Sequence, residues 1–103
     1  MVRSKKKVVL YRTDLEAFTE RQGPTFFTIY YWVSSDAGRN LKSAIENAIS
    51  VWCKRKGYEK EKNAIFGHVA YGDKRAARDE EMEVRKLIQQ IIRATGYKPQ
   101  LKR

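Results

Sequence analysis

Two sets of side chains in this chain are suited to contact a polyanion: grouped lysines and arginines, and rings that alternate along one strand-like run. The chain holds 22 Lys and Arg against 12 Asp and Glu, a net charge of +10 over 103 residues. Such an excess favours nucleic acid or an anionic membrane surface as a partner. A ring beside these cations can stack on a base, which is worth about 1–3 kcal/mol per base.

The basic residues fall into four groups, and grouping indicates a binding surface better than total charge does. Two groups lie at the ends of the chain, where we expect loose arms that follow a phosphate backbone. A third closes the first long helix and also complements its dipole. A fourth opens the second long helix, where it opposes the dipole, so phosphate contact would explain it. The groups are Arg3, Lys5, Lys6 and Lys7; Lys98, Lys102 and Arg103; Lys54, Arg55 and Lys56, extended by Lys60 and Lys62; and Lys74, Arg75 and Arg78.

A second interpretation of the fourth group stays open. Asp73 is placed to cap the helix, and acidic residues follow at helical spacing from the three cations. These carboxylates, Asp79, Glu80, Glu81 and Glu83, would then neutralise a solvated turn.

The aromatic run occupies residues 26–33 and reads Phe-Phe-Thr-Ile-Tyr-Tyr-Trp-Val. Alternation places one set of its residues toward the core, namely Phe27, Ile29, Tyr31 and Val33. The other face carries the rings that we predict to stack on bases: Phe26, Tyr30 and Trp32, with Phe66 and His68 as further candidates. Alternatively, these rings pack under a helix or in a dimer interface, where large aromatic residues are usually found.

Carboxylates are the remaining candidates for chemistry. Asp14, Asp36 and Asp73 each follow a predicted strand, and carboxylates gathered at strand ends can hold Mg²⁺ for phosphodiester cleavage. Capping of a following helix explains all three without a metal. We therefore predict no catalytic residue, no metal site and no cofactor, and we interpret Cys53 as a packing residue.

The elements that position these residues follow from hydrophobic periodicity. Strands are expected at 8–11, 26–33 and 64–71, with a brief helix from Thr13 and Asp14 through Phe18. Long helices are expected from Leu41 to a stop at Gly57, and from about Lys74 to Gly96, the latter with a polar first half that projects from the core.

These elements predict an α+β fold, a two-layer sandwich of about three strands in the order β-β-α-β-α, with both main helices on one face of the sheet. One domain would cover 1–103, with flexible basic ends at about 1–6 and 98–103. The single cysteine, the basic start and the lack of an apolar run of roughly 18 residues indicate a cytoplasmic protein without a membrane span.

The leading hypothesis is a small basic nucleic-acid-binding protein that contacts phosphates through its Lys/Arg clusters and stacks bases on the aromatic sheet face. Single-stranded or structured RNA is favoured over duplex DNA. The first alternative is a protein-binding module, a homodimer or an inhibitor of a larger enzyme, that uses the same rings. A small metal-dependent nuclease and a peripheral membrane binder are further alternatives.

Overall fold

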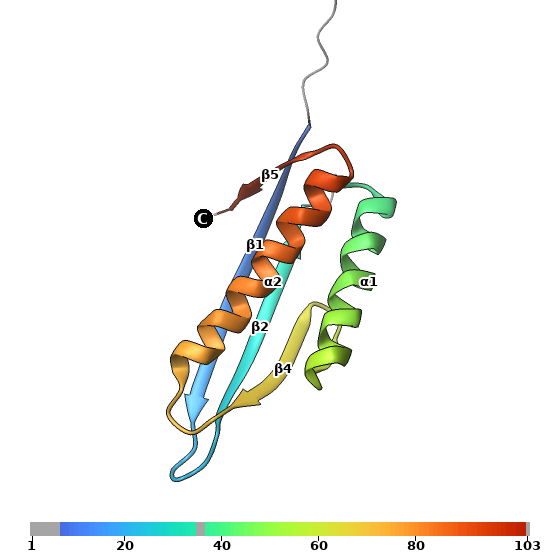
Figure 1. Cartoon of the computed structure of the whole chain (residues 1–103). Helices are drawn as coiled ribbons and strands as arrows, with labels where there is room; N and C mark the ends of the chain where they lie inside the picture. The colour runs from blue at the N-terminus through green and yellow to red at the C-terminus, as the bar shows by residue number, and fades with distance from the viewer. Residues whose placement is uncertain (1–6, 35–36, 103) are drawn as a thin grey trace, which may run out of the picture.

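The computed structural model describes residues 7–34 and 37–102, which form a five-stranded mixed sheet and two helices (Figure 1). The strand order in the sheet is β3-β4-β2-β1-β5, and among these neighbours only β1 and β5 run parallel. The α+β class agrees with the prediction. In chain order the elements are β1 (Val8–Thr19), β2 (Thr25–Val33), α1 (Arg39–Lys56), β3 (Glu59–Glu61), β4 (Ala64–Val69), α2 (Lys74–Ala94) and β5 (Lys98–Leu101).

Each helix forms where an apolar stripe recurs at three- and four-residue spacing. The stripe of α1 includes the buried Leu41, Ile45 and Ile49, and Gly57 ends the helix with a φ of 77°, which favours glycine. The stripe of α2 continues through Val84, Ile88 and Ile92, each 0% exposed.

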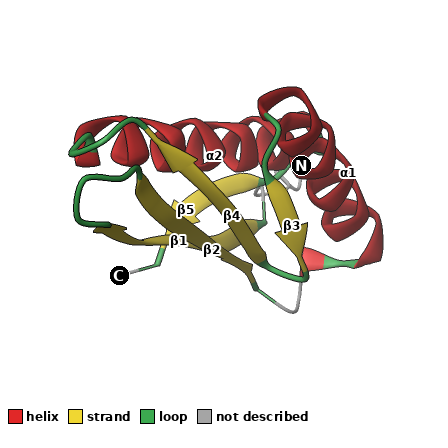
Figure 2. Cartoon of the chain, turned by 90° about the horizontal axis from the view of Figure 1, so that it is seen from below, coloured by secondary structure: helices red, strands yellow, loops and turns green. Residues whose placement is uncertain are grey.

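Both helices cover the same face of the sheet, as Figure 2 shows. Under them, Phe27 and Tyr31 of β2 are each 3% exposed and Ile29 is 0% exposed. The alternation predicted for residues 26–33 is therefore confirmed in the core of the protein, because only one face of β2 meets the helices.

The opposite face of the sheet carries neither of the described helices, and we call it the open face. Its residues follow from the strand register, since directly paired residues share a face. The open face consists of Val8, Leu10, Arg12, Asp14, Glu16 and Phe18 of β1; Phe26, Thr28, Tyr30 and Trp32 of β2; Ala64, Phe66 and His68 of β4; Glu59 and Glu61 of β3; and Lys98 and Gln100 of β5, with Lys102 just beyond.

Two predictions about the sheet are wrong. Residues 13–18 are not a brief helix but the middle of β1, which pairs with β2 from Tyr11↔Val33 to Thr19↔Thr25. Alternating burial from Val9 to Thr13 has the two-residue period of a strand, and the long partner strand extends that pattern. The sheet has five strands, because the polar segment β3 and the segment β5 also join it.

Strand β5 corrects the expectation of a loose C-terminal arm over 98–103. Lys98–Leu101 pairs with Val8–Tyr11, and the amide of Lys102 donates to the carbonyl of Tyr11 at 2.8 Å. Pro99 is tolerated because β5 is an edge strand. The predicted arm at 1–6 lies outside the described residues.

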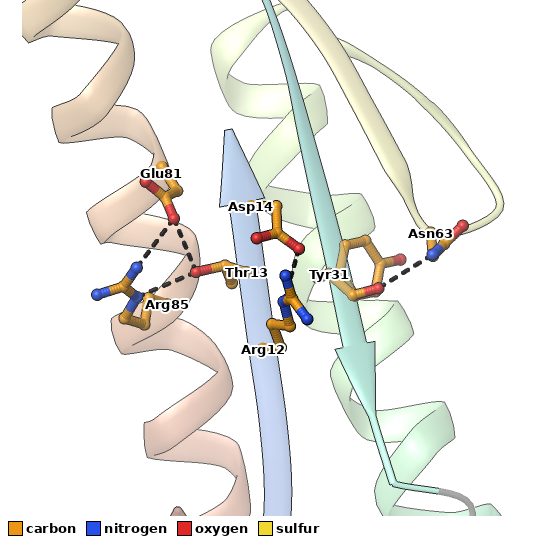
Figure 3. A network of polar contacts seen from close by, with 7 residues as sticks. All are labelled: Arg12, Thr13, Asp14, Tyr31, Asn63, Glu81 and Arg85. Atoms are coloured by element: carbon orange, nitrogen blue, oxygen red, sulfur yellow. Dashed lines mark hydrogen bonds and ion pairs between the residues drawn. The ribbon is translucent and has the colours of Figure 1, made fainter. Parts of the chain in front are cut away.

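The polar first half of α2 packs on β1 and does not project from the core. Glu81 is 8% exposed, and its carboxylate accepts hydrogen bonds from the hydroxyl of Thr13 and the guanidinium of Arg85, both at 3.0 Å. The Arg85 Nε also donates to the Thr13 hydroxyl at 3.0 Å, which closes a three-membered network (Figure 3). This satisfied polar network and the fully buried Ala77 together hold the first half of α2 against the sheet.

No helix in the described part of the chain is both long and apolar enough to cross a membrane.

Candidate functional site

The open face holds all three rings that were predicted to stack on bases. Tyr30 is 37% exposed and Trp32 is 40% exposed, whereas Phe26 is half-buried. Phe26 is shielded by its neighbours on the same face. The ring of Phe18 stacks on it with 5.6 Å between the ring centres, and the centre of the His68 ring lies 5.9 Å from that of Phe26. Phe18 itself is 60% exposed, so the cluster remains open to a partner.

Beside this cluster the surface is hollowed. A cavity of about 540 Å³ has Phe18, Phe26, Phe66 and His68 in its lining. A flat ring or an apolar side chain from a partner fits such a lining, because aromatic walls favour stacked and edge-on contacts.

Charges on the open face are unevenly distributed. Carboxylates flank the column of rings on both sides, with Asp14 and Glu16 on β1 and Glu59 and Glu61 on β3. Two cations lie near Trp32, at the end of the ring column opposite Phe26. The ammonium of Lys102 lies 4.8 Å from the centre of the Trp32 ring. The Nε of Arg12 lies 2.9 Å from a carboxylate oxygen of Asp14. The open face therefore carries both positive and negative side chains and is not uniformly cationic.

A second candidate surface lies at the ends of the helices. Figure 1 shows that α1 ends and α2 begins at the same end of the molecule. Five cations there are exposed, and none of the ion pairs among the described residues includes them. We call these residues the helix-end cations: Lys54, Arg55, Lys74, Arg75 and Arg78.

The sixth predicted cation at this end, Lys56, has carboxylate partners. Its ammonium lies 3.2 Å from a carboxylate oxygen of Glu80 and 3.4 Å from one of Glu83. Partial burial lowers the pKa of Lys56, but the two carboxylates outweigh that effect and the net shift is upward. Lys56 therefore joins the two helices to each other.

The carboxylates near the start of α2 are mostly engaged elsewhere. Asp73 caps the helix, because its side chain accepts from the amide of Ala76 at 2.9 Å. Glu81 binds Arg85, and Glu83 accepts from the indole of Trp52 at 3.2 Å as well as from Lys56. The predicted cap is confirmed, whereas the described ion pairs do not neutralise Lys74, Arg75 or Arg78.

The N-terminal group is only partly within the described residues. Lys7 is exposed, and its carbonyl accepts from the amide of Lys98 at 2.9 Å. Lys5 and Lys6 lie outside the described residues, as does Asp36.

The described carboxylates do not meet in a metal site. Asp14 lies within β1 on the open face, contrary to the prediction that it follows a strand, and Asp73 caps α2 at the start of the helix layer. Within residues 7–34 and 37–102, no group of three or more His, Cys, Asp or Glu side chains could hold a metal ion. Cys53 is buried in the core, and burial raises the pKa of its thiol.

The structure thus separates two sets of residues that the sequence had joined in one hypothesis. The rings lie on the open face, while the helix-end cations belong to the layer that covers the other face of the sheet. Sequence analysis also missed Arg12 and Phe18 as surface residues of the sheet. The alternation of buried and exposed residues through β1 is the signal that places them there.

Comparison of the chain with models of protein families, with curated proteins and with solved structures found no match.

Proposed function

We propose that this protein binds nucleic acid through contacts between phosphates and the helix-end cations. The observation that supports this most directly is that five exposed cations gather at one end of the helix layer, outside every ion pair of the described residues, while most nearby carboxylates are engaged in a cap or in other pairs. A cation without a partner gains most from a phosphate, because no existing ion pair is broken and counterions are released from the nucleic acid.

The position of three of these cations adds support. Lys74, Arg75 and Arg78 lie in the first turns of α2, where the helix dipole disfavours positive charge. An anion held at this end would offset that unfavourable interaction.

Fluorescence anisotropy of labelled single-stranded RNA, single-stranded DNA and duplex DNA at several salt concentrations tests the proposal. Changing Lys74, Arg75 and Arg78 together to Gln should weaken binding and flatten the dependence of log K on log salt by about 0.7–0.9 for each phosphate that the variant no longer neutralises. The three probes also test the prediction that single strands or structured RNA are preferred.

A matched control removes three other exposed cations of the helices, Arg39, Lys86 and Arg93, by the same change to Gln. The control should retain most of the salt dependence. An equal loss in both triple variants would mean that net charge alone attracts the nucleic acid, and absence of binding at moderate salt would refute the proposal.

A second candidate function, protein binding, is favoured by a different surface. Four carboxylates flank the rings of the open face, and carboxylates repel the phosphates of a strand laid across them. A protein partner that carries its own cations would not be repelled.

A further inference from the structure

We infer that the open face is the contact between two copies of this chain, related by a two-fold axis that crosses the strands between Tyr30 and Trp32. This inference concerns a surface that the proposed nucleic-acid binding does not use. It follows from the order of charges and rings along the open face and from the symmetry that a dimer requires.

The strand register arranges the open face in rows across the sheet. In one row Trp32 lies beside Arg12, with Lys102 next to them; in the following row Tyr30 lies beside Asp14. The side chains of Arg12 and Asp14 are each 50% exposed, so both retain free surface after pairing with each other. One row is thus cationic and the neighbouring row is anionic, and each contains one large ring.

Two sheets that face each other across a two-fold axis must present the same residues to each other in reverse order. If the axis crosses the strands midway between the two rows, Trp32 of one copy meets Tyr30 of the second copy. Arg12 then meets Asp14 of the second copy. Each contact occurs twice, and at both of them Arg12 faces a carboxylate.

The chemistry of these rows suits a protein interface. Tyr, Trp and Arg are the residues that most often dominate binding energy at such contacts. Alternation along β2 places Tyr30 and Trp32 about 7 Å apart, which allows two rings from each copy to interleave.

The same rotation fixes which strands touch. Because the axis reverses position along the strands, β1 of one copy lies against β1 of the second copy, and the middle of β2 lies against the middle of β2. Strands of the two sheets are then nearly aligned, as in a sandwich. This contact is smaller than a standard interface, which buries about 800 Å² on each partner, so we expect a dimer that dissociates on dilution.

A single nucleic-acid strand is the competing occupant. Its phosphates would have to pass Glu16 of β1 or Glu59 of β3, which flank the middle of the ring column. A second copy instead places the guanidinium of its Arg12 opposite Asp14, the neighbour of Glu16 on this face of β1, and charge complementarity at that contact favours self-association.

Sedimentation equilibrium over a range of protein concentrations tests the dimer directly. The intact chain should show twice the monomer mass at high concentration, and Trp32→Ala should raise the dissociation constant at least about tenfold, as loss of a central interface residue does. Circular dichroism and urea unfolding of Trp32→Ala at low concentration verify that the monomer remains folded. A protein that stays monomeric at every concentration, or a dimer that Trp32→Ala leaves unchanged, overturns the inference.

Charge reversal tests the predicted orientation. Arg12→Asp and Asp14→Arg should each be monomeric alone, because like charges then face each other across the axis. Mixed in equal amounts, the two variants should form a heterodimer detectable by native mass spectrometry, because Asp faces Arg at both contacts. An ion pair that matters only within one chain gives no such rescue, so failure of the mixture to associate refutes the orientation.

The last measurement is the affinity of the open-face variants for single-stranded RNA. If Tyr30→Ala and Trp32→Ala reduce RNA affinity while the intact chain stays monomeric, a base-stacking strand and not a second copy occupies the open face. The triple variant of Lys74, Arg75 and Arg78 should have the same dissociation constant for dimerisation as the intact chain, which separates failure of this inference from failure of the proposed nucleic-acid binding.

Discussion

Strand β2 places rings on both faces of the sheet, and the two sets of rings have opposite surroundings. On the covered face, Tyr31 is 3% exposed and its hydroxyl donates to the carboxylate of Glu46 at 2.9 Å, while burial raises its pKa. On the open face, Tyr30 and Trp32 are each more than one third exposed, and the ammonium of Lys102 lies over the Trp32 ring.

The difference shows that rings on the two faces have different consequences. Rings on the covered face fill the core and satisfy their polar atoms within the chain. Rings on the open face contribute little to the fold of one copy, so their exposed area remains for a partner. Substitutions on the covered face should therefore change stability, whereas those on the open face should change association.

The largest expected effect comes from a matched pair of neighbours on β2. Ile29→Ala removes a fully buried side chain and should lower the free energy of unfolding by about 2–5 kcal/mol. Tyr30→Ala, one residue away on the open face, should lower it by about 1 kcal/mol or less when the protein is dilute, because only cross-strand contacts are lost. Urea denaturation at low protein concentration measures both, and equal losses would contradict the comparison.

Substitutions of two neighbouring residues of β1, Thr13 and Asp14, should change the free energy of unfolding less. Figure 3 shows both side chains, which lie on opposite faces of the strand. Thr13→Val removes the hydroxyl that bonds Glu81 and Arg85 under α2 and should cost about 1–3 kcal/mol. Asp14→Asn breaks only the exposed pair with Arg12 and should cost less than about 1 kcal/mol. If Asp14→Asn proved the more costly change in dilute protein, the polar network beneath α2 would not anchor the helix.

The smallest expected effect is a dependence on pH in the helix layer. Burial alone would raise the pKa of Glu83, but the indole of Trp52 and the ammonium of Lys56 lower it below its ordinary value of 4.5. A lowered pKa in the folded state stabilises the protein above the unfolded-state pKa, and that contribution disappears as pH falls through the folded-state value.

Urea midpoints measured from pH 6 to pH 3 should therefore decrease less for Glu83→Gln than for the intact chain. Glu16→Gln, a change of the same type on the open face, is the matched control. If the two variants followed the same pH profile, the contacts of Glu83 with Trp52 and Lys56 would not stabilise the folded state.

Prediction from sequence succeeded where a pattern was long and apolar. The stripe of α1, the stop at Gly57 and the cap at Asp73 are all local signals, and the structure confirms each of them. Prediction from sequence failed where the secondary structure of a segment depends on pairing with a strand elsewhere in the chain. Residues 13–18 carry a Thr-Asp pair that resembles a helix start, yet pairing with β2 makes them a strand.

The candidate site, too, could be predicted only in part from the sequence. Sequence identified Phe26, Tyr30 and Trp32 as one face of a strand, and grouped Lys74, Arg75 and Arg78 at the start of a helix. It did not reveal that Lys56 binds Glu80 and Glu83, or that Arg12 and Lys102 come together beside Trp32. Each of these contacts joins residues far apart in the chain, which no local period encodes.

The sequence by itself determined the charge excess, the two amphipathic helices and the two-residue alternation of β2, because composition and periodicity are properties of neighbouring residues. Only the tertiary structure decided how many strands join the sheet, which cations have carboxylate partners, and where carboxylates flank the rings. Those outcomes depend on strand register and on helix packing, which bring together residues far apart in the chain and fix the surroundings of each side chain.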